Sequence, residues 1–315
     1  MTSESSLRQD ISLPRRSIRR LSSGLRMGSP VKYPRNRTAG SLNRHQRVVA
    51  GLFVMATLFV FPSVAPVFAA TAHQDPMDLV WQRNGSVQST NWGGYAVTGP
   101  VGSVTYAVAS WTVPTVTCAA KETSYAAFWV GIDGFTSKTV EQTGTDSDCS
   151  NGTPHYYAWY EFYPKGSKDI GSVVVHPGDS ILASITFNGG AFTDSITDST
   201  TGTSFQVTST VPKAQETSAE FIIEAPTVCK LLKCKLAPLA DFGTVGFGQD
   251  NTGVTTTLNC AATVSGVTGP IGSFGSAVQQ ITMIGQAASQ PIKAQASALS
   301  SDGTSFTDQW LLRGP

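Results

Sequence analysis

Two short runs of this chain carry side chains that could take part in acid–base chemistry. Glu224 closes the apolar run Phe221–Ile223, and Gln142 stands within Val140–Gly144. A glutamate carboxyl can exchange a proton with water, whereas a glutamine amide offers a permanent donor and an acceptor. On a β-strand alternate side chains share a face, so Glu224 would face the same side as Glu220. A glutamate in such a run is more often a solvated surface residue, and the strand pattern alone does not decide.

An aromatic run at Tyr156–Tyr163 could line a binding surface. By strand alternation, Trp159, Glu161 and Tyr163 share one face with Tyr157. A sheet face with three aromatic rings and one carboxylate suits an extended peptide or a sugar, because flat rings give contact area and polar groups fix the register. The same pattern fits a sandwich core with a few rings at its edge, so both interpretations stay open.

The run Phe128–Asp133 repeats this pattern. Trp129 and Asp133 share one face of the predicted strand, opposite its aliphatic residues. A slip of one residue in register would bury the charged groups and expose the apolar ones, so the register should be firmly set. We therefore expect one groove on a concave sheet, lined by Trp129, Asp133, Trp159 and Glu161.

Short β-type runs separated by turn residues fill the chain from Asn91 onward. Turn signals such as Pro177–Asp179 and Asn188–Gly190 separate many of them, and no clear helical period is present. This spacing predicts an all-β sandwich or barrel. The predicted strands are Val104–Val113, Tyr125–Ile132, Tyr156–Tyr163, Ser172–Val175, Ile181–Phe187, Phe205–Thr210, Ala219–Glu224 and Ala277–Ile284, with a closing strand at Phe306–Leu312.

The charge of the chain is divided between two segments. Residues 1–47 hold 11 Lys and Arg against Glu4 and Asp10, whereas residues 71–315 hold 11 Lys and Arg against 19 Asp and Glu, a net charge of −8. An acidic segment with dispersed basic residues gives no sign of nucleic-acid binding. The part after residue 70 is long enough for one large domain with a sizeable core.

Between these segments lies an uncharged run of 14 residues, Val48–Phe61. A membrane span needs about 20 residues, so this length is typical of a signal-peptide core. Small residues predict cleavage near Ala69 or Ala70, with an uncleaved membrane anchor as the less favoured alternative. The predicted organisation is a basic leader plus signal peptide over 1–70, a linker or short pro-segment over 71–90, and a secreted, extracellular domain over 91–315.

Five cysteines fit an exported protein in an oxidising compartment. Cys229 and Cys234 would close a tight loop, and Cys118 could pair with Cys149, which leaves Cys260 over. The histidines after residue 70 show no ligand spacing with these cysteines, so we expect no metal site and no cofactor.

Six segments of the chain, taken in order, resemble the glutamic peptidases, the eqolisin family. They are Asn91–Gly94, Ala127–Gly134, Gln142–Gly144, Ala158–Pro164, Pro177–Ile181 and Ala219–Glu224. The common hydrolase motifs G-x-S-x-G and H-E-x-x-H are missing from the sequence. The resemblance implies a lectin-like, antiparallel double-sheet β-sandwich and an acid endopeptidase that needs neither a metal nor a covalent intermediate.

The resemblance also assigns roles to individual residues. It implies Gln142 and Glu224 as the catalytic pair, and a substrate groove formed by Trp92, Trp129, Asp133, Trp159, Glu161 and Tyr163. Two departures from the family pattern concern substrate preference: the stretch Asp133–Gln142 is one residue shorter, and Tyr157 stands where the family has an acidic residue.

This pair of side chains suggests a mechanism. Ionised Glu224 would take a proton from the water that attacks a peptide carbonyl, and the amide of Gln142 would stabilise the oxyanion by about 3 kcal/mol. Protonated Glu224 would then donate to the leaving nitrogen, which suits acid conditions. We expect a monomer that acts on polypeptides, with no nucleic-acid or membrane partner. The alternative is a non-catalytic carbohydrate- or peptide-binding module with the same aromatic face.

Overall fold

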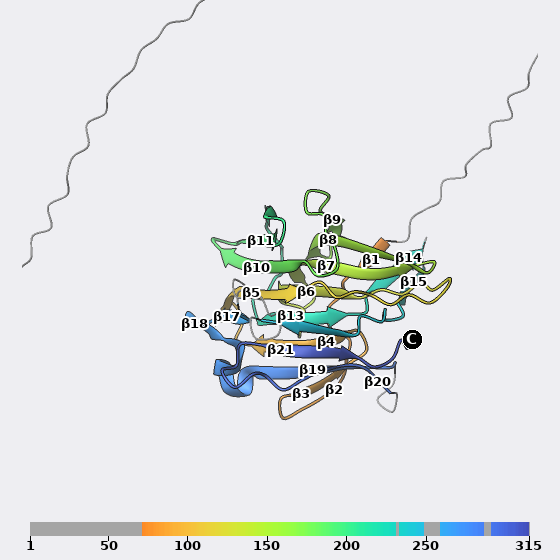
Figure 1. The fold of residues 1–315 in the computed structure, drawn as a ribbon. Coiled ribbons are helices and arrows are strands. Elements are labelled where there is room, and N and C mark those ends of the chain that lie inside the picture. The colour runs from red at the N-terminus through yellow and green to blue at the C-terminus, as the bar shows by residue number, and fades with distance from the viewer. Residues whose placement is uncertain (1–70, 231–232, 249–258, 287–290, 315) are drawn as a thin grey trace, which may run out of the picture. The chain divides into compact units, whose positions relative to one another are not determined.

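The computed structural model describes residues 71–230, 233–248, 259–286 and 291–314, which lie in one compact unit (Figure 1). The predicted leader and signal peptide lie outside the described residues. Within the described part of the chain, no helix is long and apolar enough to cross a membrane.

Strands dominate the described residues. The first eleven are β1 (Thr71–His73), β2 (Leu79–Arg83), β3 (Ser86–Ser89), β4 (Trp92–Thr98), β5 (Val104–Thr112), β6 (Ala127–Ile132), β7 (Val140–Ser150), β8 (Thr153–Tyr163), β9 (Lys168–Asp169), β10 (Ser180–Asn188) and β11 (Ala191–Asp198). The others are β12 (Thr203–Ser209), β13 (Ser218–Glu224), β14 (Thr227–Lys230), β15 (Lys233–Leu236), β16 (Thr244–Phe247), β17 (Ala261–Val264), β18 (Val267–Pro270), β19 (Val278–Ile284), β20 (Ile292–Ala296) and β21 (Phe306–Trp310). A short 3₁₀ helix, η1 (Ile271–Ala277), precedes β19.

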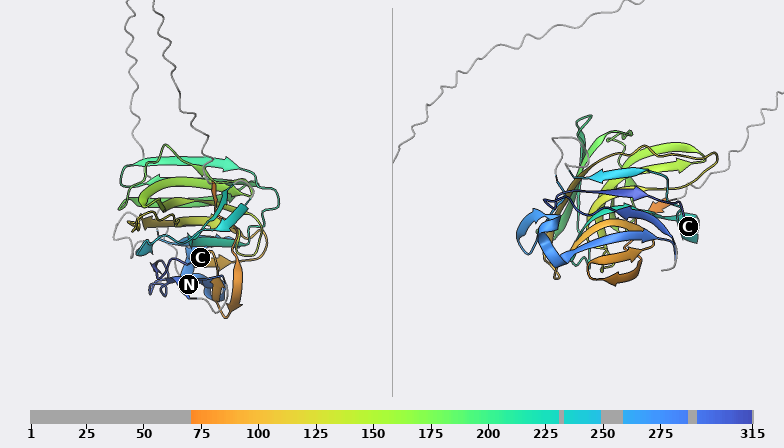
Figure 2. Two further views of the ribbon diagram at one scale, coloured as in Figure 1. Left: turned by 90° about the vertical axis from the view of Figure 1, so that its right-hand side faces the viewer. Right: turned by 60° about the horizontal axis from the view of Figure 1, so that its bottom comes forward.

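The strands form two layers. One layer runs β9–β8–β7–β6–β13–β4–β19 with antiparallel neighbours, and β3 adds to β19 in parallel (Figure 1). The other runs β12–β11–β10–β5–β17–β18, also antiparallel. Strands β10 and β11 pack against β6 and β7 without pairing with them, and the strands curve strongly in the views of Figure 2. The predicted antiparallel double-sheet β-sandwich is confirmed.

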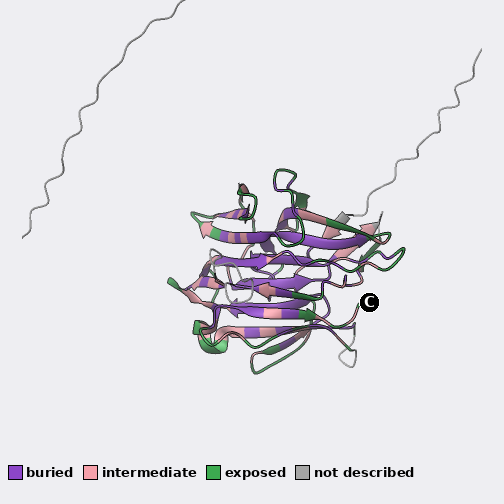
Figure 3. Ribbon diagram, in the orientation of Figure 1, coloured by how far each residue is buried: buried purple, intermediate pink, exposed green. Residues whose placement is uncertain are grey.

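Alternation along the central strands gives each face of the first layer its own role. Phe128 of β6 and Phe221 of β13 point into the main core between the layers. Their neighbours Trp129 and Ile222 point to the opposite face. We call the group on that face the tryptophan cluster; it contains Trp92, Trp129, Trp159, Val140 and Ile222. Strands β6 and β13 are buried along their whole lengths (Figure 3).

Most predicted strands are present with boundaries shifted by one to three residues, but Ser172–Val175 is not a strand. Val173 and Val175 are buried in the main core, whereas Val174 is 61% exposed. The alternating pattern therefore reflects insertion of a turn into the core, without a partner strand. Residues 71–90, the predicted linker or short pro-segment, carry β1, β2 and β3.

Both predicted disulfides are confirmed. Cys118 bonds to Cys149 at the end of β7, and Cys229 bonds to Cys234 across the β14–β15 hairpin. Strand β1 pairs with the outer edge of this hairpin, so that β1, β14 and β15 form a small separate sheet. Cys260 is buried and unpaired, as expected.

Candidate active site

Gln142 and Glu224 lie on strands β7 and β13, which flank β6 on its two sides. Both side chains are fully buried, and both contact the segment that precedes β2. Gln142 Nε2 donates a hydrogen bond to the carbonyl oxygen of Gln74 at 2.9 Å. The backbone N–H of Asp75 donates to Glu224 Oε1 at 3.0 Å. The carbonyl of residue 74 and the N–H of residue 75 belong to one peptide unit, so the two side chains bracket a single peptide bond.

The carboxyl of Glu224 is oriented by a tryptophan. The indole N–H of Trp129 donates to Glu224 Oε2 at 3.0 Å, which leaves Oε1 for the peptide N–H. Burial raises the pKa of Glu224 well above its ordinary value, and the carboxylates of Asp75 and Glu161 raise it further. The two hydrogen bonds that stabilise the ionised form only partly offset this increase.

The amide of Gln142 is held by its cross-strand neighbour. Gln142 and Glu161 are directly opposite each other on β7 and β8, and Gln142 Nε2 donates to Glu161 Oε2 at 3.1 Å. Both N–H groups of the amide are therefore used, one on Glu161 and one on the bound carbonyl. Among the described residues, Gln142 Oε1 accepts no hydrogen bond, so this oxygen can accept one from a water molecule.

Glu161 connects Gln142 to the segment that precedes β2. Its Oε2 atom accepts a hydrogen bond from the Gln74 backbone N–H at 3.2 Å, and its Oε1 atom lies 3.6 Å from His73 Nδ1, an ion-pair distance. Burial raises the pKa of Glu161 to about 7, although the histidine counteracts part of the shift. Interaction with Glu161 raises the pKa of His73 above its ordinary value. The carboxyl of Glu161 therefore stabilises the protonated form of His73.

The predicted aromatic residues meet on the same face. The rings of Trp92 and Trp129 pack edge to face with centroids 4.9 Å apart, and Trp159 and Tyr163 belong to the same contact group. Trp92 Nε1 donates to the carbonyl oxygen of Asp75 at 3.0 Å. The aromatic side chains thus supply apolar walls and a hydrogen bond to the bound backbone.

Two glycines allow Trp129 to take this position. A Cβ atom on Gly131 would lie 2.8 Å from Trp129 Cζ3, and one on Gly144 would lie 2.6 Å from Trp129 Cβ. Real side-chain contacts are not this short, so neither position has room for a larger residue beside the indole. The glycine of the Gln142–Gly144 run is therefore explained by the close approach of the Phe128 backbone and of Trp129.

Asp133 has a different role from the one predicted. Its carboxylate accepts hydrogen bonds from the backbone N–H groups of Gln215, Glu216 and Thr217 at 2.7, 2.9 and 3.0 Å. Asp133 has a positive φ of 73° at the end of β6, and this left-handed conformation ends the strand alternation on which the prediction relied. Its carboxylate fixes the loop that leads into β13 and does not contact the bound peptide bond.

The sequence reasoning missed two further carboxyl groups on this face. Trp159 Nε1 donates to Asp146 Oδ1 at 2.6 Å, and the hydroxyl of Tyr157 lies 2.9 Å from Asp146 Oδ2 and 3.0 Å from Asp148 Oδ2. A single hydroxyl proton cannot serve both oxygens, and burial raises the pKa of both acids, so one of them holds a proton. Strand alternation could have found them, because residues 146 and 148 are an even number of positions from Gln142 on β7 and therefore share its face.

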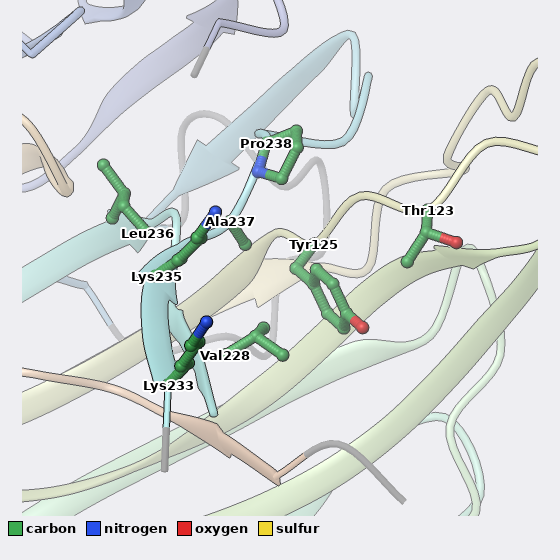
Figure 4. Close-up of a pocket in the computed structure, with 8 residues that line it drawn as sticks. All are labelled: Thr123, Tyr125, Val228, Lys233, Lys235, Leu236, Ala237 and Pro238. Carbon is green, nitrogen blue, oxygen red and sulfur yellow. The ribbon is translucent and has the colours of Figure 1, made fainter. Parts of the chain in front are cut away.

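Elsewhere in the described residues, no pocket is lined by such a set of hydrogen-bonded polar groups. A pocket of 460 Å³ lies beside the β14–β15 hairpin, between Tyr125, Lys233 and Lys235 (Figure 4), and none of the predicted site residues lines it. No three His, Cys, Asp or Glu side chains in the described part of the chain are placed to hold a metal ion.

Comparison with known proteins adds independent information. The sequence profile of the Peptidase A4 family matches residues 90–283. The chain is 33% identical to Scytalidopepsin B from Scytalidium lignicola over 181 residues, and 30% identical to Aspergillopepsin-2 from Aspergillus niger over 182 residues. These matches cover 55% and 50% of this chain, and 66% and 62% of the two relatives.

Solved structures agree with the sequence matches. A crystal structure of scytalido-glutamic peptidase with a transition state analog inhibitor superposes with a TM-score of 0.58 at 26% identity, covering 70% of this chain and 98% of that one. A structure of SCP-B, an eqolisin peptidase in complex with the tripeptide Ala-Ile-His, gives a TM-score of 0.55 at 25% identity over the same shares.

Proposed function

The chain belongs to the Peptidase A4 family, and from this premise we propose that it is a glutamic endopeptidase whose catalytic pair is Gln142 and Glu224. One observation carries the proposal. The two polar groups of the Gln74–Asp75 peptide bond are hydrogen-bonded to these two side chains, the carbonyl to Gln142 and the N–H to Glu224. An amide donor at the carbonyl and a carboxyl at the nitrogen are the groups that peptide hydrolysis requires.

The first step is addition of water to the peptide carbonyl. Ionised Glu224 takes a proton from the attacking water, and the oxygen atom of the Gln142 amide helps to orient that water. Negative charge then develops on the carbonyl oxygen, where the N–H of Gln142 stabilises it. One well-placed donor of this kind contributes about 3 kcal/mol.

The second step is release of the amine. Protonated Glu224 already accepts the N–H of the bound peptide unit, so it can give its proton to the same nitrogen as the C–N bond breaks. Burial raises the pKa of Glu224 while the groove is occupied, so the carboxyl that enters ionised is a stronger base towards the attacking water and then holds the proton for the amine. When the groove opens to water, the pKa falls towards its usual value, and the ionised form needed for the next turnover is populated in mild acid.

The test is proteolysis of a denatured protein at acid pH in the presence of pepstatin and a chelator, by the wild type and by Glu224→Gln. We expect activity from the wild type and a loss of at least about 10³-fold in the variant, because general acid–base catalysis is removed with little change of shape. Glu220→Gln is the matched control, since Glu220 lies on the same strand and face and is equally buried. A folded Glu224→Gln protein that retains most of the turnover would favour the peptide-binding module instead.

We also propose that the protein is secreted. The two disulfides support an oxidising compartment, and the 14-residue apolar run has the length of a signal-peptide core. N-terminal sequencing of protein from culture medium should give a start at or after Ala70 and no later than Asn91. Recovery of the intact chain in the membrane fraction would contradict this proposal.

A further inference from the structure

Residues 72–78, which we call the groove segment, cross the candidate active site. The segment is held through its backbone at both ends. Ser167 donates a hydrogen bond to the carbonyl oxygen of Ala72 at 2.9 Å, and the N–H of Met77 donates to the carbonyl oxygen of Gly134 at 3.0 Å. Backbone contacts of this kind hold an extended peptide in a fixed register.

The residues around the bracketed bond are held as firmly. Before the bond, the Gln74 N–H donates to Glu161. After it, the carbonyl oxygen of Asp75 accepts from Trp92 at 3.0 Å, and that of Pro76 accepts from Asn91 Nδ2 at 3.2 Å. The groove therefore binds the segment on both sides of the bond.

The groove segment also excludes other ligands. Gln142, Glu161 and Glu224 each have 0% exposed surface, as do Trp92 and Trp129. A polypeptide from outside could reach the catalytic pair only after the groove segment has left. The same contacts that bind the segment therefore block the site.

We propose that the Gln74–Asp75 peptide bond is the chain's own cleavage site, and that the groove segment blocks the active site until this bond is cut. The proposal rests on the function proposed above. It identifies the segment as a short pro-segment and as the first substrate of the enzyme.

The reaction is an ordinary hydrolysis. Water adds its hydroxyl to the carbonyl carbon of Gln74, the bond from that carbon to the nitrogen of Asp75 breaks, and a proton passes to this nitrogen. The products are a carboxyl group on Gln74 and a free amine on Asp75. If the leader is removed after Ala70, the released peptide is Thr71–Gln74, which is held by the β1–β14 ladder and by the contacts of Ala72, His73 and Gln74.

The test follows the N-terminus and the activity of the same sample. Full-length secreted protein is purified near neutral pH and shifted to acid, and both quantities are measured over time. We expect Asp75 to appear as the new N-terminal residue, at a first-order rate that does not depend on protein concentration. Hydrolysis of an added denatured protein should rise in step, by at least about tenfold, because the site becomes accessible. A rate proportional to protein concentration would overturn the intramolecular cleavage.

Two variants at one position separate this inference from a merely structural role of the segment. Asp75→Pro removes the N–H that Glu224 accepts, and the extended backbone expected before a proline suits a residue lying in a groove. This variant should keep an uncut N-terminus and stay inactive on added protein. Asp75→Asn keeps the N–H, so it should be cut at the same bond and become active. Equal cutting of both variants would overturn the inference.

The remaining outcomes distinguish failure of the proposed cleavage site from failure of the proposed function. Proteolysis that depends on Glu224 without a cut at Gln74–Asp75 would overturn the cleavage site and leave the proposed function standing. Absence of both cutting and proteolysis would overturn the two together. The Asp75–Pro76 bond is itself labile in acid, so a start at Pro76 in both the wild type and Glu224→Gln identifies chemical cleavage. If that is the sole new start in the wild type and none appears at Asp75, the proposal is overturned.

Discussion

Gln142 and Glu141 are neighbours on β7 and point to opposite faces of one layer, and their surroundings differ sharply. The amide of Gln142 donates two hydrogen bonds, to Gln74 and to Glu161. The carboxyl of Glu141 makes no hydrogen bond of good geometry to any described residue, although it is 0% exposed. Hydrogen bonds fix the side chain of Gln142, whereas the carboxyl of Glu141 is buried without one.

Glu141 is not an isolated case. Asp194, Glu220 and Asp308 are equally buried, and their carboxyl oxygens also make no hydrogen bond of good geometry within the described residues. Burial raises the pKa of Glu141 to about 10, and it raises the pKa of the other three well above their ordinary values. Glu224 differs from these four acids because two donors, the Trp129 indole and the Asp75 N–H, orient its carboxyl. Elsewhere the acid must stay protonated to be tolerated.

The largest expected effect is on the free energy of unfolding, which should depend on pH. A carboxyl whose folded-state pKa is raised binds its proton more tightly in the folded protein, so its contribution is fully present below the unfolded pKa of about 4. As pH rises above 4, each such group lowers the free energy of unfolding by roughly 1.4 kcal/mol per pH unit, up to its folded-state pKa. Thermal unfolding from pH 3 to 8 should therefore show a melting temperature that falls steadily.

The variants Glu141→Gln and Asp194→Asn should flatten that pH dependence, because they remove protons that only the folded state retains. The same experiment on Asp302→Asn is the control, since Asp302 is an exposed acid with a lowered pKa. A wild-type melting temperature that stays constant or increases between pH 4 and 7 would contradict the explanation based on buried acids.

The next largest effect is a difference in kcat between variants of the two neighbours on β7. Gln142→Glu replaces a permanent N–H donor with a carboxyl that donates only when protonated, so kcat should fall by about 10²-fold. Like-charge repulsion from Glu161 and Glu224 should also shift the pH profile, because it raises at least one pKa of the group. Glu141→Gln should leave kcat within about threefold of the wild type. Equal losses in the two variants would show that β7 as a whole, and not its outer face, carries the effect.

A smaller effect is expected from Trp129→Phe, which removes the indole N–H bonded to Glu224. That bond favours ionised Glu224, so its loss should raise the pKa of this carboxyl further. The acid limb of the kcat profile should therefore move to higher pH, and kcat should fall by about tenfold. A simple drop in activity with an unchanged pH profile would assign Trp129 to packing alone.

The smallest effect concerns substrate choice. In the groove segment, His73 stands two residues before the bracketed bond and faces Glu161. We expect a synthetic peptide containing Ala-His-Gln-Asp-Pro-Met to be cleaved a few times faster, as kcat/KM, than its His→Ala analogue. Glu161→Gln should abolish this preference. A preference that survives in Glu161→Gln would place the recognition of histidine elsewhere.

The sequence predicted the sandwich and the residues on the face of the tryptophan cluster, because strand alternation shows which side chains share a face. Trp129, Trp159 and Glu161 occupy alternate positions on neighbouring strands, and a buried sheet admits only one register for them. Gln142 and Glu224 are far apart in the sequence but bind the same peptide unit, and their pairing was predicted only through the resemblance to a family.

What the sequence did not predict has physical reasons. The groove segment binds chiefly through its backbone, and a polar stretch without periodicity does not reveal such contacts. Asp133 departs from its predicted face because its left-handed backbone ends the alternation. Asp146 and Asp148 were overlooked because polar residues on a strand usually indicate solvent, whereas here they accept hydrogen bonds from Trp159 and Tyr157.

The central place of β13 has a consequence for hydrogen exchange. This strand is paired with β4 and β6 over its whole length, so its amide protons should exchange only when much of the sandwich opens. Strand β1 is three residues long and paired on one side only, and its amides should exchange orders of magnitude faster. Strand β1 can therefore open and close many times while the strand that carries Glu224 keeps its amide protons.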